Sequence, residues 1–261
     1  MIRQPNLTTT MSHSYQKLTR LNLGSGPGGI EGWLNVDADV KLRARPFLPL
    51  LRLLGRLGIA SRSTILMYEA YAPPPNLRPW NFARRPLPLP PDSMDAVFTS
   101  HTLEHFPRYI ALRVVRDLHR VLRPGGILRV AVPDLEVACR RYLLSRGVPA
   151  PTLPAAQATP MTGREVNLLF YNRDHVEPTP RMFSVDYRLS GISHHMYIFD
   201  ADDMFDLLHD AGFDGVTRRA YREGACPDLE RLDTHPEVSL YVEARKPGPR
   251  APAPILGTRV P

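Results

Sequence analysis

Short apolar runs, typical of strands buried in a sheet, recur along the chain and alternate with helical patterns. We expect strands over residues 19–23, 33–37, 94–100 and 127–133. Two more strands are expected late in the chain, in "GVTRRA" and in "VSLYVEARK", where every second residue from Val238 is apolar. The last two strands would form an antiparallel hairpin with a long connection.

Helices are predicted where apolar residues return at a spacing of three or four. The apolar set Ile110, Val114, Leu118 and Val121 defines a long amphipathic helix, which "RPGG" (123–126) should end. Asp134 and Asp200 are expected to cap two later helices. An amphipathic basic helix over 46–59 is expected to pack on its own domain, with a substrate cover or a membrane-surface contact as alternatives.

Alternating strands and helices predict an α/β fold with a doubly wound, Rossmann-like sheet of about seven strands that ends in an antiparallel hairpin. One domain is expected over 1–245, with insertions at about 41–75 and 148–190 serving as a cover or lid. The proline-rich segment 246–261 should be a disordered tail. Only residues 24–32 separate the first two strands, so the first helix should be shortened to about a turn.

Charge and cysteine content narrow the class of protein. The formal net charge is +7, but the basic residues are scattered and form no run with interleaved aromatics. Two distant cysteines, Cys139 and Cys226, suggest no disulfide framework or metal clip, and we expect both to be reduced. No apolar run is long enough to span a bilayer and the N-terminus lacks a secretory pattern, so a cytoplasmic location is expected.

The turn after the first strand, "GSGPGG", matches the dinucleotide-binding pattern loosely through Gly24, Gly26 and Gly29. By itself this pattern is weak evidence, since such turns also occur without ligands. Asp37 closes the next strand, where a carboxylate can accept both hydroxyls of a ribose. The two features together favour a nucleotide-like cofactor.

The chain resembles the class I S-adenosylmethionine (SAM)-dependent methyltransferases, particularly the type 11 group. The resemblance rests on "LNLGSGPG", "GWLNVD", "LPLPPDSMDAVFTSHTLEHF", "VLRPGGILRVAVPD", "DLLHDAGF" and "SLYVEARK", which follow one another in the family's order. It covers about residues 19–147 and 191–245, and the combination is far more specific than any one motif.

The resemblance implies SAM as the cofactor and assigns residues to it. Gly24, Ser25 and Gly26 would contact its methionine part, and Asp37 would hold the ribose. Asn81 stands where the family usually has an aspartate on the adenine amine, with the backbone at Phe82 beside the ring. Thr99 and Ser100 would line the sulfonium end. Asn22 departs from the acid that many members carry before the glycines, which leaves the contact to the SAM amino group open.

The resemblance also implies that a histidine can remove a proton from the acceptor. His105 and His101, in "SHTLEHF", are the first candidates. A helix N-terminus there would keep a histidine neutral and basic. The alternative for Glu104 and His105 is a bracing role against the sheet.

His194 is a third catalytic candidate, after the expected lid, with Asp174 and His175 nearby. A metal site from His175, His194 and His195 is the sharper alternative, but no HxH or HxxxH pair supports it and we expect no metal. Asp134 follows a strand at the same edge, and capping explains it equally well.

We therefore expect a SAM-dependent methyltransferase that acts on a small molecule or glycan precursor, with oxygen as the expected acceptor atom. The alternatives are a methyltransferase-like protein that binds without catalysis and an NAD(P)-dependent oxidoreductase. The expected partner is a small-molecule acceptor, with no nucleic acid and no stable membrane insertion, and the sequence leaves a homodimer open.

Overall fold

One seven-stranded sheet organises the chain in a computed structural model that describes residues 18–26, 29–38, 48–57, 76–149, 154–171 and 195–248. The strands lie in the order β3-β2-β1-β4-β5-β7-β6. Their bounds are β1 (Arg20–Leu23), β2 (Leu34–Asp37), β3 (Leu77–Pro79), β4 (Met94–Ser100), β5 (Leu122–Pro133), β6 (Asp214–Arg219) and β7 (Ser239–Arg245). β1 to β5 are parallel, and β7 runs antiparallel to both β5 and β6. The predicted fold class is confirmed, including the terminal antiparallel hairpin.

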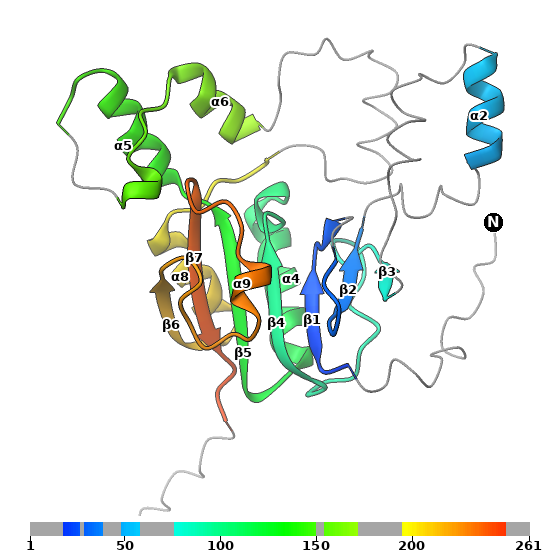
Figure 1. Cartoon of the computed structure of the whole chain (residues 1–261). Coiled ribbons are helices and arrows are strands. Elements are labelled where there is room, and N and C mark those ends of the chain that lie inside the picture. Colours follow the sequence, from blue (N-terminus) through cyan, green and yellow to red (C-terminus); the bar gives the residue numbers. More distant parts are fainter. Residues whose placement is uncertain are drawn as a thin grey trace, which may run out of the picture.

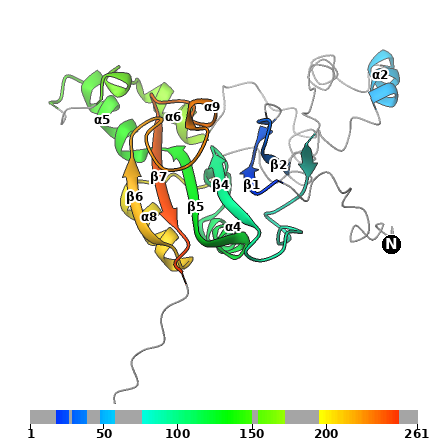
Figure 2. The same ribbon diagram turned by 60° about the horizontal axis from the view of Figure 1, so that its bottom comes forward.

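Helices cover both faces of the sheet. The described helices are α2 (Leu48–Arg56), the 3₁₀ helix η4 (Leu103–His105), α4 (Arg108–Val121), α5 (Leu135–Ser145), the 3₁₀ helix η5 (Ala155–Gln157), α6 (Gly163–Tyr171), α8 (Ala201–Asp210) and α9 (Leu229–Leu232). α4 and α8 lie on one face and α9 on the other (Figure 1, Figure 2). α5 and α6 lie beyond the carboxyl ends of the parallel strands, at the top of Figure 1.

Two apolar cores, one on each face, follow from the period of two along each strand. Val97 of β4 packs with α4 and α8 in the larger core, whereas Phe98 packs in a smaller core with Leu229 and Leu232 of α9. The predicted apolar stripe of α4 is buried in the larger core. Burial of both faces explains why β4 and β5 read as nearly continuous apolar runs.

Both predicted helix caps are present. The Asp134 carboxylate accepts hydrogen bonds from the backbone N–H groups of Glu136 and Val137 at the start of α5. Asp200 accepts one from Asp203 N at the start of α8. These contacts satisfy N–H groups that have no partner within the helix.

Four elements, β3, α6 and the short helices η5 and α9, were not predicted, and β5 begins earlier than expected. β3 lies in a proline-rich stretch that carries only three strand residues, and α6 lies in the segment interpreted as a lid. β5 starts at Leu122, directly after α4, because Gly125 takes φ +79° and the pairing with β4 shifts between Met94 and Ala96. "RPGG" therefore ends the helix as predicted but belongs to the strand.

The connection between β1 and β2 has no regular α-helix among its described residues, in line with the predicted shortening. The helix expected over 46–59 is present as α2, but Leu50, Leu53 and Leu57 are 51%, 51% and 63% exposed. Packing of α2 on its own domain is therefore not confirmed. None of the described helices combines the length and apolarity needed to cross a membrane. Lys246, at the start of the expected tail, still forms backbone hydrogen bonds with Gly125 and Gly126 in β5.

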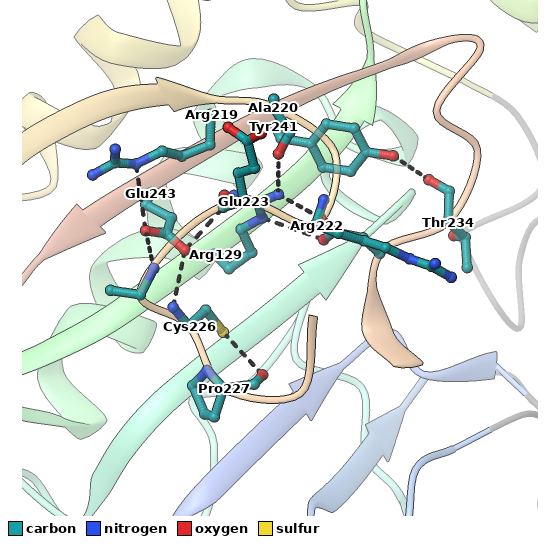
Figure 3. Close-up of polar contacts among 12 residues, drawn as sticks. Arg129, Arg219, Ala220, Arg222, Glu223, Cys226, Pro227, Thr234, Tyr241 and Glu243 are labelled. Carbon is teal, nitrogen blue, oxygen red and sulfur yellow. Dashed lines mark hydrogen bonds and ion pairs between the residues drawn. The ribbon is translucent and has the colours of Figure 1, made fainter. Parts of the chain in front are cut away.

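A buried ionic cluster joins the sheet to the connection between β6 and β7. Arg129 of β5 has no exposed side-chain surface and makes an ion pair with Asp233, which is equally buried. Its guanidinium also donates to the carbonyl oxygens of Ala220 and Glu223, and Glu243 lies 3.6 Å away (Figure 3). These contacts fix residues 220–234 against the sheet face that α4 and α8 leave uncovered.

We predict that Asp233→Asn lowers the free energy of unfolding by about 3–5 kcal/mol, because it leaves the buried Arg129 charge without its main partner. Glu230→Gln is the matched control. It breaks an exposed ion pair with Arg222 and should cost less than about 1 kcal/mol. Urea unfolding monitored by circular dichroism measures both, and equal losses for the two variants would contradict the assigned role of Arg129.

Candidate functional site

The carboxyl ends of β1, β2, β4 and β5 meet at one edge of the sheet (Figure 1). In the register, Leu23 of β1 pairs with Val36 of β2 on one side and with Thr99 of β4 on the other. Gly24, Asp37 and Ser100, each one residue further along its chain segment, therefore lie side by side at this edge. Parallel α/β sheets bind their ligands here.

The first two glycines of the turn are required for different reasons. Gly24 has φ +70°, and a Cβ built on it would lie 1.9 Å from Thr102 Oγ1, so a larger residue would collide with the segment after β4. Gly26 has φ +57°, and apart from its chain neighbours no atom of the described residues lies within 4 Å of a Cβ built there. Gly24 thus serves internal packing, and the space in front of Gly26 is available to a ligand.

Asp37 connects the end of β2 to this turn. The Gly26 N–H donates to Asp37 Oδ2 at 2.7 Å, and Gly24 N donates to the Val36 carbonyl oxygen at 2.8 Å. The Asp37 side chain is largely buried, at 8% relative exposure of the residue. A carboxylate is thereby held against the glycine backbone at the ligand-binding edge.

Three buried oxygen atoms at this edge have no hydrogen-bond partner within the described part of the chain. They are Asn81 Oδ1, Thr99 Oγ1 and Ser100 Oγ. Buried polar atoms are nearly always satisfied, so three orphans near one edge indicate a missing polar ligand or water. Phe82 is buried, but its backbone N–H already donates to the Trp80 carbonyl oxygen. This N–H is therefore engaged within the protein and is not available to an adenine ring.

Asn22 has a structural partner. Its Nδ2 donates to Asn35 Oδ1 at 3.0 Å, and the same oxygen accepts from Ile30 N. Asn22 and Asn35 thus clamp the two strands and the end of the glycine turn. A contact from Asn22 to the cofactor's amino group receives no support from this geometry.

His101 follows β4 in a left-handed conformation, with φ +47°. Its Nε2 lies 2.9 Å from Ser239 Oγ, and its ring packs edge-on against His235. Burial, followed by the neighbouring His235, His195 and His105, lowers the pKa of His101 to about 3. The ring is therefore neutral, but the cause is desolvation and histidine neighbours rather than the helix N-terminus expected from the sequence.

Glu104 and His105 lie in η4, and a distant segment joins them. The backbone N–H groups of Met196 and Tyr197 both donate to the Glu104 carbonyl oxygen, which brings His195 beside η4. The rings of His105 and His195 pack edge-on with centroids 4.9 Å apart. Glu104 has no exposed surface, and burial raises its pKa to about 8.

Of the three histidines predicted as catalytic candidates, the structure describes two. His101 and His105 both lie close to the Glu104 carboxylate. His194, Asp174 and His175 lie outside the described residues. Asp134 serves as the α5 cap and pairs with Arg218, which agrees with the capping interpretation. Sequence reasoning missed the pairing of Glu104 with His195, because no local spacing relates the two.

The edge offers the groups that a nucleoside cofactor requires. A carboxylate, two hydroxyls, an amide oxygen and an open glycine backbone can bond the hydroxyls and amino groups of such a ligand. The strand order agrees less well with a dinucleotide-binding sheet, since β7 runs antiparallel between β5 and β6.

Comparison with known families gives a match to the family described as "Methyltransferase domain" over residues 74–130. The matched segment spans β3 to β5 and contains Asn81, Thr99, Ser100 and η4. No curated protein sequence matches the chain.

Several solved structures are similar at low identity. A Methanosarcina mazei SAM-dependent methyltransferase is 15% identical, with 88% of this chain and 92% of that chain covered and a TM-score of 0.43. A Mesorhizobium loti SAM-dependent methyltransferase is 20% identical over 87% and 90%, with a TM-score of 0.38. A complex of the Haloferax volcanii Trm112 methyltransferase activator with a methyltransferase is 14% identical, with 89% of this chain and 83% of that chain covered and a TM-score of 0.43. Scores this low add nothing to the fold seen directly in the sheet.

The family match and the sheet agree with each other. The match includes two parallel strands whose ends carry the orphaned polar atoms, and the strand order places the antiparallel β7 where the resemblance predicted a terminal hairpin. The methyltransferase-domain match over residues 74–130 and the strand order of the sheet both support a SAM-dependent methyltransferase.

Proposed function

We propose that the chain transfers the methyl group of SAM to a hydroxyl of a small-molecule or glycan-precursor acceptor. SAM supplies a methyl group that its sulfonium already activates, so the protein has to bind, align and desolvate the two reactants. The observation that carries the oxygen assignment is the cluster of His101, His105 and His195 beside the cofactor edge, in which burial lowers the pKa of His101 to about 3. A hydroxyl must lose its proton during transfer, and a neutral imidazole can accept it.

The cofactor assignments form part of this proposal. Gly24, Ser25 and Gly26 would lie against the methionine part, Asp37 would hold the ribose hydroxyls, and Thr99 and Ser100 would face the sulfonium end. The orphaned Asn81 Oδ1 supports a contact with the adenine amine. Phe82 would contribute its buried ring rather than its N–H.

Among the candidate proton acceptors, His105 is favoured over His101. Burial lowers the pKa of His101 to about 3, which makes it a weak base. His194 remains a prediction, because it lies outside the described residues. Cytoplasmic location and the dimer remain predictions as well.

The experiment that tests the function supplies the purified chain with SAM carrying a ¹³C-labelled methyl group and a library of hydroxylated metabolites and nucleotide sugars. We expect S-adenosylhomocysteine to form and the label to appear on oxygen, as identified by NMR and mass spectrometry. Label on nitrogen or carbon would contradict the oxygen assignment. SAM binding without turnover on any acceptor would favour the non-catalytic alternative.

The ribose assignment predicts that Asp37→Ala weakens SAM binding tenfold or more, which corresponds to about 1.4 kcal/mol. Isothermal titration calorimetry measures the dissociation constant, and thermal unfolding checks that the variant is folded. Asp95→Ala is the control, since Asp95 is an exposed carboxylate near the start of β4, at the opposite edge. Equal dissociation constants for wild type and Asp37→Ala would refute the assignment.

The two glycines should respond differently to alanine. Both variants pay about 1–2 kcal/mol for a side chain at positive φ, but Gly24→Ala also collides with Thr102 and should be clearly less stable. Gly26→Ala should remain folded and lose SAM affinity, because its methyl group enters the space assigned to the cofactor. Unchanged SAM affinity in a folded Gly26→Ala variant would remove the cofactor from this position.

His105→Ala should lower single-turnover methyl transfer by about 10²–10⁴-fold while SAM binding survives. His209→Gln removes a histidine at the end of α8, away from the site, and serves as the control. A parallel loss of folding stability without an effect on transfer would support the bracing role of His105 instead.

A further inference from the structure

Glu104 is the least satisfied ionisable group in the described part of the chain. Its residue has no exposed surface, and neither carboxylate oxygen has a hydrogen-bond partner there. Its backbone oxygen accepts hydrogen bonds from Met196 N and Tyr197 N, and histidine nitrogens lie near its carboxylate, at 3.5 and 3.9 Å. A buried carboxyl group whose oxygens make no hydrogen bond costs free energy, so its presence here points to a ligand that the side chain binds.

His195 presents a nitrogen lone pair to this carboxylate. Its Nδ1 contacts the carbonyl oxygen of Leu169 in α6, and a carbonyl can only accept, so Nδ1 must carry the hydrogen. In the neutral ring the lone pair is then on Nε2, which lies 3.9 Å from Glu104 Oε1. A carbonyl behind the imidazole is the usual support of a metal-binding histidine.

His105 completes a compact set of donors. The ligand atoms of Glu104, His105 and His195 all lie within 4.8 Å of one another. Two ligands of a tetrahedral zinc ion are about 3.4 Å apart, so inward shifts of less than about 1 Å would bring the three atoms to bonding distance. His101 approaches the same carboxylate through Nδ1 at 3.5 Å, from outside this set.

We propose that Glu104, His105 and His195 bind a divalent metal ion, with zinc as the ion that best suits two imidazoles and one carboxylate. Two nitrogens and one oxygen are the donors of catalytic zinc sites that keep a fourth position open for water or substrate. This set differs from the His175, His194 and His195 site considered from the sequence, and only His195 is common to both.

The site lies next to the end of β4, on the edge that carries the proposed cofactor residues. If the proposed function holds, the open position of the ion would face the acceptor, and a coordinated hydroxyl would lose its proton more easily. His105 would then be a ligand rather than the proton acceptor. Metal binding itself does not depend on that function.

The test uses the untagged full chain, freed of metal with a chelator and titrated with ZnCl₂. We expect one zinc per chain by mass spectrometry of the desalted protein, and a Co²⁺ form with the visible absorption of a four- or five-coordinate site. Glu104→Gln and His195→Ala should each lose at least about 10–100-fold in zinc affinity, whereas His209→Gln should bind as wild type does.

Circular dichroism checks the fold of each variant, and Glu104→Gln decides the outcome if His195→Ala does not fold, since it keeps the size of the side chain. No zinc on the wild-type chain, or equal zinc on wild type and Glu104→Gln, would overturn the proposal. The proposed methyl transfer can survive that outcome, because it would then proceed without zinc and still depend on His105.

Discussion

The parallel pairing of β1 with both β2 and β4 is the constraint on which the site depends. Because Leu23 pairs with Val36 and with Thr99, the glycine turn, Asp37 and the end of β4 must emerge side by side. The close approach of Thr102 to Gly24 then locks the turn against the segment that carries Glu104 and His105. A shift of one residue in either pairing would turn these side chains to the other face of the sheet and separate them.

The two faces of this sheet are stabilised by different interactions. Apolar packing dominates beneath α4 and α8, whereas the opposite face combines a small apolar core with the buried Arg129 cluster. The cluster ties residues 220–234 down, and these residues precede His235, which packs against His101. The conformation of His101 is therefore supported from the side of the sheet remote from α4.

Most of the sheet could be predicted from the sequence, because β4, β5, α4 and α8 carry long, unambiguous apolar patterns and two of the helices begin at aspartate caps. β3 could not, since a three-residue strand among prolines has no period and forms only by pairing with β2. α6 was missed because its segment is short and is surrounded by prolines and polar residues. Tertiary contacts decide such elements, and local propensity does not.

The sequence indicates which residues meet at the edge of the sheet, but it does not reveal the contacts that require each of them. Gly24, Asp37, Asn81, Thr99 and Ser100 meet at the expected edge, yet Gly24 is required by Thr102 and Asn22 by Asn35. The neutral state of His101 arises from burial, which no local pattern reveals.

The most direct test of the central claim is a crystal structure with S-adenosylhomocysteine. The account predicts the nucleoside against Gly26 with its ribose on Asp37, and a nucleoside bound elsewhere, or a side chain filling that space, would contradict it.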